Sequence, residues 1–194
     1  MTSKRQVLIV SDLHCGSHFG LTPPRWQHKA DSAKYQKLQA ITWEWWCKEI
    51  KRAGNIDLVI CNGDAIDGTG YRSGGTEQIT TDRQEQVEIA IECLSKIKAK
   101  KFHFTYGTPY HNGDAEDYEL SIAKSFDAKI GGHEWVQVGG VVFDCKHTIG
   151  GSVVPHARYT ALGREDLWAG LWNELGASPK ANIIVRSHVH YHVF

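Results

Sequence analysis

The sequence lacks the features of a secreted, membrane-spanning or strongly nucleic-acid-binding protein. Its first apolar run, Val7 to Val10, is only four residues long, which is too short for the core of a signal peptide or for a membrane span. Lys+Arg and Asp+Glu both number 22, so no net positive field attracts the chain to nucleic acid or anionic lipid, although local basic patches are compatible with this balance. We therefore predict a cytoplasmic protein without a membrane partner.

Cysteine pairs, repeats and low-complexity tracts are also missing. The five cysteines are odd in number and form no CxxC pair, so neither a disulfide framework nor a thiolate zinc site is indicated. We interpret them as buried or incidental thiols. A length of 194 residues with 41% hydrophobic content is typical of a globular domain with a substantial core, and we predict one domain over residues 1–194.

The hydrophobic pattern alternates between two types along the chain. Short runs rich in β-branched or aromatic residues predict strands at Val7 to Val10, Leu58 to Ile60, Phe102 to Tyr106, Val141 to Phe143 and Ile183 to Val185. Between them, helical spacing of apolar residues predicts helices at Ser32 to Ala53, Asp82 to Lys100, Ala115 to Phe126 and Arg164 to Leu175. This alternation indicates an α/β fold with helices covering the sheets.

Groups that bind divalent cations follow most of the predicted strands. They lie in five segments: Asp12-Leu13-His14, Gly63-Asp64, Gly107 to Asn112, His147, and Ser187-His188-Val189-His190. Ligands of open α/β sheets usually bind beyond the carboxyl ends of the strands, so one rim can gather all five segments. In an extended segment, residues two apart project to the same side, which would let DxH and HxH each present two groups to one cavity. Carboxylates and imidazoles in this arrangement predict a site for two divalent ions.

The ordered set DLH, GD, a glycine-led loop with histidine, a lone histidine and SHVH resembles the calcineurin-like metallophosphoesterases. Any one motif arises often by chance, but five in order over residues 12 to 190 are a specific signal. The resemblance implies a four-layer sandwich of two mixed β-sheets flanked by helices. It also implies that Asp12, His14 and His190 bind one metal, that His147 and His188 bind the second, and that Asp64 bridges both.

The third motif departs from the family pattern, in which an Asn ligand is followed directly by a catalytic His. This chain reads Gly107-Thr108-Pro109-Tyr110-His111-Asn112, and a threonine hydroxyl is a poor ligand for such a metal. Two interpretations stay open: His111 supplies the missing second-metal ligand, or His111 is the catalytic residue, with Asn112 as a reserve oxygen ligand. Gly131-Gly132-His133-Glu134 also looks like a degenerate copy of the motif, and we expect His133 to lie outside the site. The remaining histidines we interpret as structural or surface residues: His18, His28, His103, His156 and His192.

We therefore predict a metal-dependent phosphoric ester hydrolase acting on a phosphomonoester or phosphodiester. Two cations would supply a bridging hydroxide near neutral pH and stabilise the charge that develops on the phosphate. Nitrogen and oxygen ligands favour manganese, iron, zinc or nickel without choosing among them. In the loop from Gly68 to Gly75, Arg72 would bind the substrate phosphate; the alternative is a surface loop in which Arg72 contacts only water.

Other functions stay open within the same set of motifs. They are a nuclease acting on DNA or RNA, a catalytically silent binding scaffold, and a metal hydrolase of a non-phosphoester substrate. The family would ordinarily continue beyond the segment Tyr191 to Phe194. Either the fold closes early or the C-terminus is truncated, in which case an open sheet edge would favour self-association; the oligomeric state stays uncertain.

Overall fold

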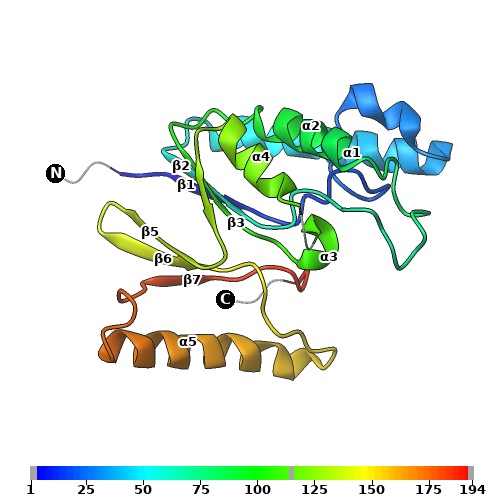
Figure 1. The fold of residues 1–194 in the computed structure, drawn as a ribbon. Helices are drawn as coiled ribbons and strands as arrows, with labels where there is room; N and C mark the ends of the chain where they lie inside the picture. The colour runs from blue at the N-terminus through cyan, green and yellow to red at the C-terminus, as the bar shows by residue number, and fades with distance from the viewer. Residues whose placement is uncertain (1–3, 114–115, 192–194) are drawn as a thin grey trace.

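The computed structural model describes residues 4–113 and 116–191, which form two β-sheets with helices on their outer sides (Figure 1). The first sheet has four parallel strands in the order β1-β2-β3-β4, namely Val7–Val10, Leu58–Asn62, Phe102–Thr105 and Lys129–Gly131. The second sheet has the order β5-β6-β7, namely Glu134–Val138, Val141–Cys145 and Ile183–Val185. In it, β5 pairs antiparallel with β6, and β6 pairs parallel with β7.

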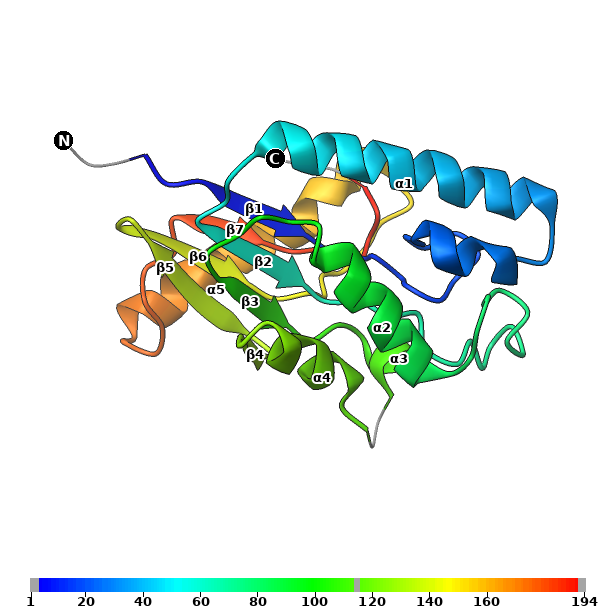
Figure 2. The same ribbon diagram turned by 90° about the horizontal axis from the view of Figure 1, so that it is seen from above.

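The helices divide between the two sheets. The α-helices are α1 (Ala33–Ala53), α2 (Arg83–Leu94), α3 (Pro109–Asn112), α4 (Tyr118–Ser125) and α5 (Arg158–Glu174), with short 3-10 helices η1 (Pro24–Lys29) and η2 (Pro155–Ala157). Helices α1, α2 and α4 lie over the first sheet, while α5 lies on the far side of the second sheet (Figures 1 and 2). Over residues 4–113 and 116–191, no helix combines the length and the apolarity that crossing a membrane requires.

Two hydrophobic clusters hold these elements together. The larger one joins the first sheet to α1, α2 and α4, and Phe104 at its centre is only 1% exposed. The smaller cluster joins the inner faces of the two sheets, with Leu58 and Ile60 of β2 packed against Phe143 and Val185. Because β2 is buried on both faces, its sequence is a continuous apolar run rather than an alternating one.

The strand directions bring the candidate cation-binding segments to one edge. Strands β1, β2 and β3 run parallel, so their carboxyl ends lie at the same side of the first sheet, and β6 and β7 likewise end together. The loops after β1, β2 and β3 therefore meet those after β6 and β7 near α3, as Figure 2 shows for the first sheet.

The sequence predictions agree with the structure for the five expected strands and for the positions of the long helices. Strands β4 (Lys129–Gly131) and β5 (Glu134–Val138) were not among the expected strands, and β4 is too short to show a pattern. The predicted helix at 82 to 100 ends at Leu94, so the lysines at its expected last turn lie beyond the helix. The helix expected from Ala115 begins at Tyr118, and residue 115 lies outside the described residues.

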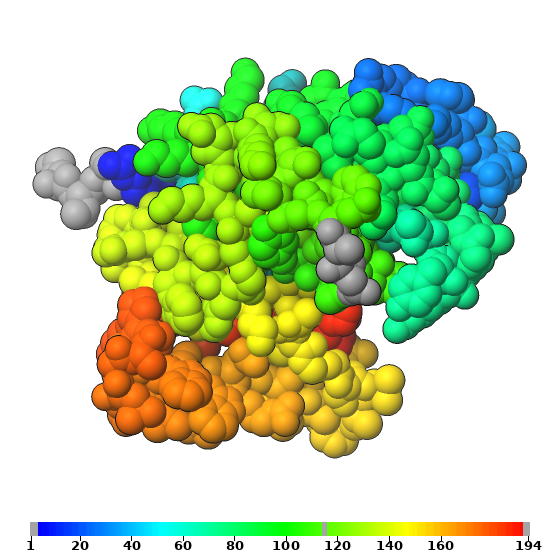
Figure 3. Space-filling view, viewed as in Figure 1, coloured from blue at the N-terminus to red at the C-terminus, as the bar shows by residue number. Residues whose placement is uncertain are grey.

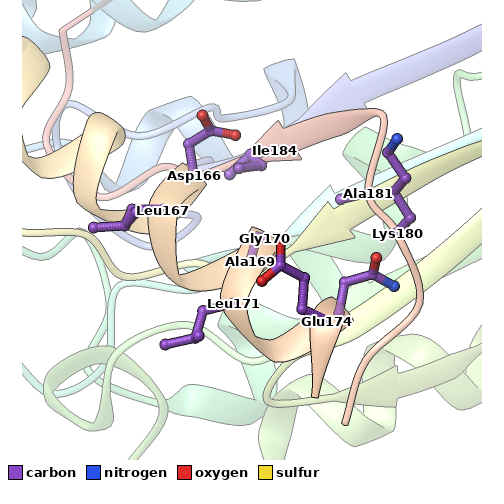
Figure 4. Close-up of a pocket in the computed structure, with 10 residues that line it drawn as sticks. Asp166, Leu167, Ala169, Gly170, Leu171, Glu174, Lys180, Ala181 and Ile184 are labelled. Atoms are coloured by element: carbon purple, nitrogen blue, oxygen red, sulfur yellow. The ribbon is translucent and has the colours of Figure 1, made fainter. Parts of the chain in front are cut away.

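The last helix differs more from its prediction. Helix α5 begins at Arg158 rather than at Arg164. The helical spacing of its apolar residues predicts a face packed on a sheet, but these residues are exposed: Leu167 is 70%, Trp168 51%, Leu171 40% and Leu175 66% exposed. An ion pair links the helix to the residue directly after β7, in which Arg186 Nε donates to Glu165 Oε2 at 2.9 Å. A hollow of about 520 Å³ remains between α5 and β7, bordered by Asp166, Lys180 and Ile184 (Figure 4). Helix α5 and the turn after it, coloured orange, form a separate layer at the bottom of the space-filling view (Figure 3).

Replacing Phe104 by alanine should lower the free energy of unfolding by about 3–5 kcal/mol, because it removes a fully buried ring and leaves a cavity. The matched control is Phe19→Ala, at a phenylalanine that is 60% exposed, which should cost less than about 1 kcal/mol. Urea unfolding followed by circular dichroism measures both. Equal losses for the two variants would contradict the assignment of the core.

Candidate metal centre

Three groups of carboxylates and imidazoles gather at the common edge of the strands. Their potential ligand atoms lie within 4.8 Å of one another in each group, and the groups are Asp12 with His14 and His190, His14 with Asp64 and His111, and Asp64 with His147 and His188. The groups share His14 and Asp64, so they form one continuous cluster. Residues 12 and 190, far apart in sequence, come within 3.1 Å at Asp12 Oδ1 and His190 Nε2.

The backbone at this cluster adopts an unusual conformation. Six residues other than glycine have positive φ in the described part of the chain, and five of them are in the cluster: Asp12, His14, Asp64, His188 and His190. Such conformations cost energy for residues with a Cβ and concentrate at functional sites. The expectation that DxH and HxH are extended segments is therefore wrong, because left-handed backbone aims these side chains together instead.

Asp64 and His147 form the buried half of the cluster. Asp64 is 0% and His147 1% exposed, and His147 Nε2 lies 2.8 Å from Asp64 Oδ2. Burial by itself raises the pKa of Asp64 and lowers that of His147, but the contact between the two outweighs burial, so the pKa of Asp64 is lowered and that of His147 is raised above 6.5. Thr108 stands where the family pattern has Asn, and its backbone N–H donates to Asp64 Oδ1 at 2.7 Å.

The hydrogen bond of His147 Nδ1 determines which ring nitrogen carries the proton, and therefore whether Nε2 has a free lone pair. His147 Nδ1 lies 2.6 Å from the Asn62 carbonyl, and since a carbonyl only accepts, Nδ1 carries the proton. In the neutral ring, Nε2 then has a free lone pair. Nε2 is buried and makes no well-aligned hydrogen bond within residues 4–113 and 116–191. A nitrogen lone pair without a hydrogen bond beside a carboxylate oxygen is a donor set that fits a divalent cation.

The segment after β3 brings His111 close to His14. The two rings lie edge to face with centroids 4.5 Å apart, whereas His147 pairs with His188 at 5.5 Å. His111 Nδ1 donates to the Asp67 carbonyl at 2.8 Å, which leaves Nε2 facing Asp64 Oδ2 at 3.8 Å. His111 Nε2 and Asp64 Oδ2 both carry lone pairs, so their approach is favourable only with a proton or a cation between them. The geometry therefore suits His111 both as a metal ligand and as a proton donor.

Asn112 is turned away from this contact. Its Nδ2 donates to Glu119 Oε2 at 2.8 Å, and its buried Oδ1 has no hydrogen-bond partner among the described residues. Arg72 lies outside the cluster, with its guanidinium 4.9 Å from the centroid of the Tyr110 ring. His133 lies in none of the three groups; its Nε2 contacts Asp144 Oδ1 at 2.7 Å, and its ring stacks on Trp135.

Sequence reasoning missed three residues that support the cluster, namely Asn62, Asp67 and Glu119. Asp67 Oδ1 contacts His14 Nδ1 at 3.0 Å, which raises the pKa of His14 although burial opposes this. Asn62 donates to Ser187 Oγ at 2.8 Å and to the Lys146 carbonyl, so it ties β2 to the loops after β6 and β7. Asn62 and Asp67 lie on either side of Gly63-Asp64. Polar residues at the end of a buried strand were a sequence signal that could have identified both as part of the site.

The sequence did not indicate that Glu119 of α4 supports the site, because a single acidic residue in an amphipathic helix is usually a surface charge. Its side chain is fully buried and accepts from the backbone N–H groups of Ala65 and Gly107, each at 2.8 Å, as well as from Asn112. Burial raises the pKa of Glu119 to about 7 despite these donors. Glu119 therefore links the loop after β2, the loop after β3 and α4 beneath the cluster.

The metal-free protein should lose stability as the pH rises from 4.5 to about 7. Glu119 keeps its proton over this range when folded and loses it when unfolded, so unfolding releases a proton, and the loss amounts to roughly 3 kcal/mol. His14 and His147, with pKa values above 6.5, add a loss at higher pH, while carboxyls with lowered pKa change stability at lower pH. Urea unfolding in EDTA at several pH values measures the slope. It should flatten in Glu119→Gln, and an unchanged slope would contradict the assignment.

Comparison with protein families places the chain. The calcineurin-like phosphoesterase family model matches residues 5–107, more than half of the 194 residues. The matched segment contains Asp12, His14, Asp64 and the substrate-binding candidate Arg72, and it ends at Gly107, ahead of the other candidate metal ligands. Comparison with curated proteins gave no match. The chain therefore belongs to the calcineurin-like phosphoesterase family, whose members are generally hydrolytic and typically bind divalent metal ions.

Proposed function

We propose that the protein is a binuclear metal-dependent phosphoesterase that hydrolyses a phosphomonoester or a phosphodiester. The observation that supports this most strongly is the presence of two separate three-residue groups of metal-binding side chains, one around Asp12 and one around Asp64, in contact with each other. Asp12 Oδ1 of the first group lies 3.9 Å from His147 Nε2 of the second. One isolated ion would not require both groups.

In this proposal Asp12, His14 and His190 hold one cation, His147 and His188 hold the other, and the Asp64 carboxylate is shared. A carboxylate suits the shared position because its charge can serve two cations at once. Manganese, iron, zinc and nickel all accept such nitrogen and oxygen donors. When bound, the cations activate water for attack and neutralise the phosphate oxygens. Thr108 N–H and His147 keep the Asp64 carboxylate oriented.

We propose that His111 gives a proton to the leaving oxygen. Its Nε2 faces the cluster, and Asp67 orients the ring from behind through the carbonyl contact with Nδ1. Asp67 is a positioning residue in this scheme, since it acts on His111 and His14 rather than on the substrate. Asn112, whose buried Oδ1 has no hydrogen-bond partner in the described part of the chain, is the reserve oxygen ligand of the proposal. Glu119 fixes its amide.

The arrangement of the two sheets also supports a proposal about how the layers of the fold are stacked. We propose that the sheets and their outer helices form the four-layer sandwich of the family, as one domain over residues 1–194. The cluster of apolar residues between β2, β6 and β7 is what supports this packing of the sheets.

Changing Asp64 to Asn should reduce manganese-dependent hydrolysis by at least about a hundredfold, because the amide lacks the charge that the cations need. The assay compares p-nitrophenyl phosphate, its bis ester and single-stranded DNA, with and without EDTA. Asp127→Asn is the matched control, since Asp127 also has a positive φ yet lies outside the three groups. It should keep full activity. Turnover that persists in Asp64→Asn and in EDTA would overturn the proposal, and wild-type protein that binds manganese without turnover would indicate a scaffold.

Changing His111 to Gln separates a proton donor from a ligand. If His111 is the donor, the variant keeps two manganese ions per chain but loses about a hundredfold or more in kcat on an alkyl phosphate, and much less on a p-nitrophenyl ester, whose leaving group needs no proton. Elemental analysis and steady-state kinetics measure the two effects. His133→Gln, at a histidine outside the site, is the control. Loss of one metal ion with equal loss on both substrates would identify a ligand instead.

A further inference from the structure

Two tyrosines and an arginine form a small exposed surface beside the cluster. Tyr71 and Arg72 come from the loop between β2 and α2, and Tyr110 comes from α3. The Tyr71 and Tyr110 ring centroids are 4.8 Å apart, and the Arg72 guanidinium lies 4.9 Å from the Tyr110 centroid. We name these three residues the Tyr–Arg platform. The two views show the loop beside α3 (Figures 1 and 2).

The platform remains open to solvent on one side. Tyr71 is 64% exposed, and Arg72 is also exposed. Within residues 4–113 and 116–191, Arg72 makes no ion pair; its recorded contacts are with the two tyrosine rings. Tyr110 is half-buried. An exposed tyrosine ring and a guanidinium without an ion pair in the described part of the chain lie outside the core, and such groups stack on planar ligands.

The loop that carries the platform is well anchored. Gln86, which is fully buried, accepts from the N–H groups of Asp67 and Gly68 and donates to the Gly68 carbonyl at 2.7 Å. The N–H groups of Ser73 and Gly75 both donate to the Gly70 carbonyl at 3.0 Å. At Gly68 a Cβ would come within 2.6 Å of the His111 carbonyl, so the loop and α3 touch there. Such a surface loses little entropy when a ligand binds.

The platform is continuous with the proposed proton donor. The Tyr110 and His111 rings meet edge to face at 4.7 Å, and the loop that bears Tyr71 also contains Asp67, which orients His111. A group attached to the leaving oxygen would therefore lie on the side of His111 and reach Tyr110 first. The residues that contact this group decide which esters are preferred.

We propose that the Tyr–Arg platform binds the planar base of a nucleotide, so that the preferred substrate is a phosphoester of a nucleoside rather than of a simple sugar or alkyl alcohol. This inference rests on the proposed function. The aromatic faces stack on the base regardless of its identity, and the N–H groups of Arg72 serve the edge of the base or a further phosphate. A free mononucleotide and a single-stranded oligonucleotide share this chemistry.

The test compares two substrates with the same primary alkoxide leaving group, adenosine 5′-monophosphate and ribose 5-phosphate, in manganese. Wild-type protein should favour the nucleotide in kcat/KM by about tenfold or more, which corresponds to one stacked base. Tyr71→Leu should lose most of this preference with little change on ribose 5-phosphate. Tyr71→Phe, which keeps the ring, should retain it. Single-stranded oligonucleotides and the corresponding abasic chains form a second pair that distinguishes the two nucleotide sources.

Binding provides a readout that does not need turnover. Equilibrium dialysis of adenosine 5′-monophosphate against manganese-loaded protein should show about tenfold weaker binding for Tyr71→Leu and unchanged binding for Tyr71→Phe. Absence of turnover on every ester with this binding pattern intact would reject the proposed function and keep the platform. Turnover on p-nitrophenyl esters with no nucleotide preference, or equal effects of the two Tyr71 variants, would overturn the platform.

Discussion

A buried carboxylate without direct access to water is the constraint around which this structure is organised. Asp64 is fully buried, and an ion in that position is stable only if nearby donors or charges compensate for lost hydration. His147 and the Thr108 N–H supply part of that compensation. A second buried acid, Glu119, lies on the other side of the same loops, and its pKa of about 7 is raised partly by Asp64. Asp64 is thus held ionised, whereas Glu119 is neutral below about pH 7, which limits the repulsion beneath the site at lower pH.

The strand order then determines which residues reach Asp64. Parallel pairing of β1, β2 and β3, and of β6 and β7, directs five loops to one edge. At that edge the chain takes left-handed backbone at five of the candidate residues. Each such residue is unfavourable by itself, and the buried strands and the hydrogen bonds of Asn62 stabilise the loops that contain them.

Burial varies sharply across the cluster. The side chain of His147 is 1% exposed, whereas that of His190 is 60% exposed. The buried side therefore provides a fixed geometry, and the open side provides access for a substrate. The Tyr–Arg platform lies next to His111, so in the proposed function chemistry and selectivity depend on adjacent but different residues.

The sequence by itself determined the alternation of strands and helices and the segments that carry Asp12, His14, Asp64, His147, His188 and His190, because periodicity and motif order are local properties of the chain. It failed where local pattern and tertiary setting disagree. Helix α5 has an apolar stripe that the structure leaves exposed, and β4 is too short to have a pattern. Only the tertiary structure decided that His111 lies beside His14, that Thr108 donates to Asp64, and that Glu119 is buried. These are contacts between segments distant in sequence, and they depend on strand register and loop conformation rather than on any residue's neighbours along the chain.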